Sequence, residues 1–120
     1  MNIAHLLSAA CLTWGACAIA ASAMPEIASG DGLVNAGVEG CLERADTFIN
    51  SLAVSVERGP MDRTGYFNDG SFRILCYPSP YDLENQGSLV VVFVAHESDF
   101  AVADTFVQIT LGEIADRTDR

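Results

Sequence analysis

The chain has 120 residues, four cysteines and a formal net charge of −10 at pH 7. This length accommodates one domain and leaves little room for a second. Hydrophobic residues make up 50% of the chain, which excludes wholesale disorder. The excess of carboxylates disfavours nucleic acids and anionic membrane surfaces as partners, because both repel it.

Residues 1–23 have the composition of a secretory signal peptide. No Asp, Glu, Lys or Arg precedes Glu26, and the stretch ends in Ala21-Ser22-Ala23, the small-x-small pattern that signal peptidase accepts. We therefore expect an exported protein, periplasmic or secreted, that leaves the membrane after cleavage. Two alternatives are an uncleaved segment that anchors the protein in a membrane and a lipoprotein modified on Cys17.

Cys41 and Cys76 are the two cysteines that follow the signal segment. Exported proteins fold in an oxidising space, so the pair predicts one disulfide bond. Closing a loop of about 35 residues would stabilise the fold by roughly 3–4 kcal/mol. Two buried free thiols are the alternative. A metal site would need further ligands, so no metal is expected here.

The first part of the exported chain divides into a linker and a helix. Residues 24–37 are rich in glycine and small polar residues, which predicts a flexible linker. Residues 38–58 place apolar side chains at three- and four-residue steps, which predicts a helix with Cys41 on or beside its buried stripe. Gly59-Pro60 would end it, and Asn35 would cap its start.

Three strands are expected next. The turn Asn68-Asp69-Gly70 between two apolar runs is typical of a hairpin. In its second arm, alternation places Cys76 on the same face as Phe72 and Ile74. The uninterrupted apolar run of residues 89–95 predicts a strand that is covered on both faces.

Residues 98–116 are ambiguous between strand and helix. Their β-branched content favours a strand, whereas apolar and polar side chains segregate to opposite sides of a helical wheel. We expect a helix, because packing of an apolar face usually outweighs intrinsic propensity. Ser98 is the expected N-cap, and Gly112 is a point at which the helix could end early.

The predicted fold is therefore α+β, with a small antiparallel sheet of about three strands flanked by an N-terminal and a C-terminal helix in the order α-β-β-β-α. The expected organisation is a signal peptide (1–23), a linker (24–37), a single domain (38–116) and a tail (117–120). If both helices cover one face of the sheet, the other face would expose apolar side chains and serve as an interface. If the helices take opposite faces, the sheet is sealed and no such interface is expected. The residues expected on this partner surface are Leu75, Tyr77, Val90, Val92 and Val94, with Tyr66 and Tyr81 at its rim.

The densest polar cluster follows the apolar run and contains His96, Glu97 and Asp99. Such a cluster could act as a general base or bind a metal, but a strand exit followed by a helix cap needs the same residue types. The sequence contains no recognised catalytic or phosphate-binding motif, so neither a catalytic residue nor a cofactor is assigned.

These features favour an exported, acidic protein-binding module: an inhibitor, an immunity-type protein or an accessory subunit that meets another, basic protein. The first alternative is a self-associating structural envelope protein, for example a homodimer. The second is a small enzyme or ligand carrier that uses His96, Glu97 and Asp99.

Overall fold

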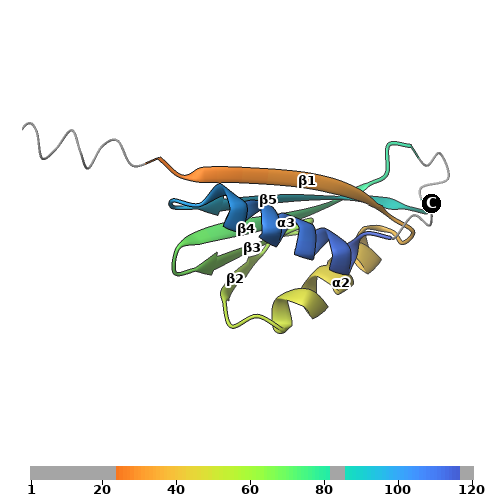
Figure 1. The fold of residues 1–120 in the computed structure, drawn as a ribbon. Helices are drawn as coiled ribbons and strands as arrows, with labels where there is room; N and C mark the ends of the chain where they lie inside the picture. The colour runs from red at the N-terminus through yellow and green to blue at the C-terminus, as the bar shows by residue number, and fades with distance from the viewer. Residues whose placement is uncertain (1–23, 82–85, 117–120) are drawn as a thin grey trace, which may run out of the picture.

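A five-stranded antiparallel sheet in the order β1-β5-β4-β3-β2 carries two helices on one of its faces (Figure 1). This computed structural model describes residues 24–81 and 86–116. The strands are β1 (Glu26–Val34), β2 (Ser55–Arg58), β3 (Asp62–Phe67), β4 (Gly70–Pro78) and β5 (Ser88–His96). The helices are α2 (Val38–Asn50) and α3 (Phe100–Ile114). The α+β class is thus confirmed, but the sheet has five strands rather than about three.

The core lies between the sheet and the helices. Alternate residues of β4 and β5 face the helices, and their register pairs Phe72 with Val94, Ile74 with Val92 and Cys76 with Val90. All six side chains are at most 1% exposed. Helix α3 packs on β1 and β5, whereas α2 packs on β3, β4 and β5. The rings of Phe48 in α2 and Phe106 in α3 meet edge to face, with centroids 6.1 Å apart.

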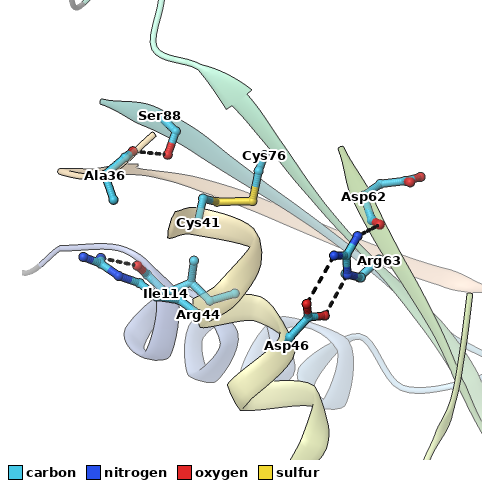
Figure 2. The surroundings of a disulfide bond; sticks show 9 residues. All are labelled: Ala36, Cys41, Arg44, Asp46, Asp62, Arg63, Cys76, Ser88 and Ile114. Carbon is cyan, nitrogen blue, oxygen red and sulfur yellow. Dashed lines mark hydrogen bonds and ion pairs between the residues drawn. A yellow bond between two sulfur atoms is a disulfide. The ribbon is translucent and has the colours of Figure 1, made fainter. Parts of the chain in front are cut away.

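The predicted disulfide between Cys41 and Cys76 is confirmed (Figure 2). It connects the first turn of α2 to β4, with the two Cα atoms 6.0 Å apart and both residues fully buried. The helical pattern and the strand alternation had each placed one cysteine on the buried side, so the bond joins two faces that were expected to meet.

The expectation of a flexible linker over residues 24–37 is wrong, because Glu26–Val34 form β1 and pair with β5 along their full length. The glycines that suggested a linker have a packing role. A Cβ on Gly30 would lie 2.9 Å from Leu111 Cδ1, and a Cβ on Gly32 would lie 2.6 Å from Ala115 Cβ. Glycine therefore lets α3 approach the backbone of β1 closely.

The first predicted helix is shorter than expected. It ends at Asn50, and Ser55–Arg58 form the edge strand β2. Val54 and Val56 are half-buried while Ser55 and Glu57 are exposed, so the period in this segment is two rather than 3.6. The second helix is confirmed, and it continues past Gly112 to Ile114.

Candidate functional site

The face of the sheet opposite the helices carries no other element of the described chain (Figure 1). Side chains that alternate with the core residues point to this side. In the register of the sheet they form rows that cross the strands. One row contains Leu33, Leu89 and Tyr77, and the next contains Asp31, Val91, Leu75 and Asp62. The third row contains Ser29, Phe93, Arg73, Thr64 and Glu57. We call this surface, completed by Ile27, Ala95, Ser71, Tyr66 and Ser55, the open sheet face.

The open sheet face is apolar in its centre and charged at its sides. Leu75, Leu89 and Val91 are half-buried by their neighbours, while Phe93 is 42% exposed on the central strand. Large apolar side chains that remain exposed together on a sheet are unusual for a surface that faces only water, and they are typical of interaction sites.

Three of the seven residues expected on the partner surface lie on the helix side of the sheet. Val90, Val92 and Val94 are at most 1% exposed and face the helices. Because side chains of a strand alternate, the residues of β5 that reach the open sheet face are Leu89, Val91 and Phe93. An uninterrupted apolar run does not show which of its residues face the helices. The disulfide does, because Cys76 must face α2 to reach Cys41, and its cross-strand neighbour Val90 must face the same side.

Leu75 and Tyr77 lie on the open sheet face as expected, and Tyr66 lies on it near β2. Tyr66 and Tyr77 are 46% and 41% exposed. Tyr81 follows β4, is 80% exposed, and lines a shallow apolar hollow beside Leu33 at the end of β1. The three tyrosines thus surround the apolar centre and are not gathered in one place.

A polar hollow adjoins the apolar centre over β2, β3 and β4, and it is lined in part by Glu57, Tyr66 and Arg73. Arg73 Nε donates to Asp62 Oδ2 over 2.9 Å. This contact raises the pKa of Arg73 above its usual value, since the hydrogen bond and the charge of Asp62 both favour the cation. The charge of Arg73 is therefore balanced by Asp62 within the surface, whereas Asp31 and Glu57 have no ion pair among the described residues.

The same imbalance holds for the whole described surface. Each of its four arginines lies within ion-pairing distance of a carboxylate, in the pairs Arg44–Asp116, Arg58–Asp46, Arg63–Asp46 and Arg73–Asp62. The other carboxylates of the described chain have no such partner. The described surface is consequently acidic, and its cations are already engaged.

The polar cluster after β5 has structural contacts. His96 is 8% exposed, and its Nδ1 accepts hydrogen bonds from the backbone N–H groups of Ser98 (3.2 Å) and Asp99 (2.9 Å). The Asp99 carboxylate caps α3 by accepting from Ala101 N, so Asp99 rather than the expected Ser98 is the N-cap. His96 and Glu97 line one shallow hollow with Asp69, but Asp99 does not reach it. The three residues are therefore not assembled into one site.

A second apolar surface was not expected from the sequence. Val102 and Ile109 of α3 are 45% and 53% exposed and line a shallow hollow with Phe106. Phe100 is 51% exposed but stands apart from them, at the start of the helix. The helical wheel placed all three residues on its apolar side, which was expected to be buried. Val102 and Ile109 remain outside because, by helical periodicity, they lie beyond Phe106 on the side of α3 that is turned away from the sheet.

Residues 24–81 and 86–116 contain no group of three or more His, Cys, Asp or Glu side chains arranged to hold a metal ion. None of the helices described there is long and apolar enough to cross a membrane. The expected signal peptide and the tail lie outside the described residues. Comparison of the chain with protein-family models, curated proteins and solved structures gave no match.

Proposed function

We propose that this protein is an exported protein-binding module that docks through its open sheet face onto a basic surface of another protein. The observation that carries the proposal is the uncovered side of the sheet, where Leu75, Val91 and Phe93 form an apolar centre flanked by carboxylates. An apolar centre with a charged rim is the usual anatomy of a protein interface.

Charge supports a basic partner in particular. The described arginines are engaged by the protein's own carboxylates, so its cations add little attraction for an acidic partner. The unpaired acids instead accelerate encounter with a positively charged surface. Inhibitors, immunity-type proteins and accessory subunits all act by such stoichiometric docking, and we place this protein among them.

Export is part of the proposal. It rests on the pattern of residues 1–23 and on the disulfide, because Cys41 and Cys76 form a buried bond that an oxidising compartment would maintain. The partner should therefore be an envelope or secreted protein.

The test is a quantitative capture experiment with matched variants. The full chain, with a C-terminal tag, is expressed with export, and partners are captured from envelope and secreted fractions at low and moderate salt. Phe93→Glu places a charge in the apolar centre of the open sheet face, whereas the control Ile109→Glu places the same charge on the exposed side of α3. Both wild-type residues are about half exposed, at 42% and 53%.

We expect a stoichiometric basic partner that wild type and Ile109→Glu retain, that Phe93→Glu loses, and that salt releases. A partner lost with Ile109→Glu but not with Phe93→Glu would move the binding site to α3. The absence of any stoichiometric partner for the folded wild type at low salt would refute the proposal.

Self-association is the second candidate, and the apolar centre favours it as well, because a two-fold axis could place two open sheet faces together. The two candidates respond oppositely to salt. Screening weakens the attraction of an acidic chain for a basic partner but relieves the repulsion between two acidic chains. Sedimentation of the pure protein at rising salt therefore separates them: a dimer that strengthens with salt supports self-association.

A further inference from the structure

Strand β1 forms one edge of the sheet, and half of the backbone N–H and C=O groups of β1 point away from its neighbour β5. The carbonyl of Leu33 accepts a hydrogen bond from the backbone N–H of Asp116, at 2.9 Å, so this carbonyl is directed away from β5. Backbone groups of alternate residues point to the same side of a strand. The N–H and C=O groups of Ile27, Ser29 and Asp31 are therefore directed outward too, and no hydrogen bond from the described chain reaches them.

The edge is closed at one end and open along the rest. Asp116, just after α3, bonds to Leu33 through its N–H and receives the N–H of Asn35 on its carboxylate. From Glu26 to Asp31 nothing comparable covers the edge in the described chain, and Figure 1 shows β1 (orange) running along the margin of the molecule. The opposite edge strand, β2, has only four residues.

Exposed edges are usually protected by proline, lysine or a bulge. Within Glu26–Val34, β1 contains neither proline nor lysine, and its register with β5 is continuous. Its charges are all negative, at Glu26 and Asp31. Such an edge repels a second copy of itself, because antiparallel pairing would gather the acids of both copies along one seam.

Helix α3 adds a third acid beside this edge. Its residues Val107 and Leu111 lie over Gly30 of β1, while Phe106 on its opposite flank meets α2. By helical periodicity, Asp104 shares the flank of Leu111, on the side away from α2. No described arginine or histidine pairs with Glu26, Asp31 or Asp104. The free edge is thus bordered by negative charge on both faces of the sheet.

From this geometry we infer that β1 accepts an extended, basic segment of the partner protein as a sixth strand, hydrogen-bonded to the outward groups of Ile27, Ser29 and Asp31. Alternate side chains of the added strand would face Asp31 on the open sheet face and Asp104 beside α3. The inference rests on the proposed function, since it specifies how a basic partner would reach the same face.

The direct test uses two defined probes: a nine-residue peptide of alternating valine and lysine, and its counterpart of alternating valine and glutamate. Binding to the folded full chain is measured at low salt up to about 1 mM peptide. We expect the lysine peptide to bind and the glutamate peptide not to bind. The variant Ser29→Pro removes an outward N–H and obstructs the edge while leaving the ladder with β5 intact. It should weaken binding at least about tenfold, whereas the control Ser29→Ala should bind like wild type.

Two further measurements identify the mode of binding. Amide hydrogen exchange of the free protein should be fast at Ile27, Ser29 and Asp31 and slow at Ala28 and Gly30, and the peptide should protect the first group. Asp31→Lys should weaken binding of the lysine peptide and strengthen binding of the glutamate peptide. Failure of the lysine peptide to bind, equal binding of both peptides to wild type, or unchanged binding by Ser29→Pro would each overturn the inference.

The captured partner separates this inference from the proposed function. A partner that Phe93→Glu loses and Ser29→Pro retains leaves the open sheet face as the binding site and refutes strand addition. Loss of the same partner with both variants, but not with Ser29→Ala, supports both proposals.

Discussion

Arg63 of β3 and Asp46 of α2 form a two-point ion pair, with Nε 2.7 Å from Oδ1 and Nη2 3.2 Å from Oδ2 (Figure 2). Arg63 Nη1 also donates to the carbonyls of Gly59 and Asp62, so the guanidinium connects the helix to the turn between β2 and β3. The hydrogen bond from Arg63 holds the pKa of Asp46 below its usual value, and the charges of Arg63 and Arg58 act in the same direction against the effect of burial.

Replacing this carboxylate gives a pH-dependent loss of stability. Asp46→Asn should lower the free energy of unfolding by about 1–2 kcal/mol at neutral pH, because the charge-assisted hydrogen bonds are lost. Since the pKa is depressed in the folded state, this contribution is complete above the unfolded-state pKa of about 3.9 and disappears as the pH falls through the lower folded value.

Urea titrations of wild type and variant at pH 7 and in steps below pH 4 measure the difference. Glu43→Gln, on the same helix and without an ion pair in the described chain, is the control and should change stability little at either pH. A difference for Asp46→Asn that persists unchanged in strong acid would contradict the electrostatic assignment.

The disulfide should contribute more to stability than any ion pair. It closes a span of 35 residues between α2 and β4, so its removal should lower the free energy of unfolding by roughly 3–4 kcal/mol. The double variant Cys41→Ala/Cys76→Ala can be compared with the oxidised protein by chemical denaturation. A loss below about 1 kcal/mol would mean that the bond adds little to the packing of α2.

The disulfide also explains which parts of the fold were predictable. Hydrophobic periodicity in α2 and alternation in β4 placed both cysteines on buried faces, so the pairing of Cys41 with Cys76 could be predicted from the sequence. The apolar run of β5 has no alternation, and its valines were assigned to the wrong face for that reason. Only their pairing with β4 determines which side each residue takes.

Strand β1 could not be recognised from the sequence, because its glycines are more typical of a linker than of a strand. Glycines such as Gly30 and Gly32 usually indicate a loop, yet here they make room for Leu111 in α3 and for Ala115 just after it, about 80 positions later in the chain. A contact at that separation leaves no local periodicity. The open edge and the charge around it depend on β1, so the strand addition that we propose could not be predicted from the sequence either.

Two glycine substitutions should therefore have opposite effects. Gly32→Ala brings a Cβ to 2.6 Å from Ala115 Cβ, so helix or strand must shift, and we expect a loss of about 1–3 kcal/mol. Gly112→Ala meets nothing within 4 Å inside α3 and should stabilise the protein by about 0.5–1 kcal/mol. Thermal denaturation of the two variants decides this, and a destabilising Gly112→Ala would show that α3 needs flexibility at that position.

The start of α3 tests whether the polar cluster after β5 is structural. Asp99→Ala removes the carboxylate that accepts from Ala101 N, so it should cost about 1 kcal/mol of stability. His96→Ala removes the acceptor of two backbone N–H groups and should also destabilise the protein. Glu97→Ala is the control and should change stability little, because the exposed side chain of Glu97 has no hydrogen bond or ion pair in the described chain. If all three variants unfold like wild type but lose a measurable activity or ligand, the residues serve chemistry and not the cap.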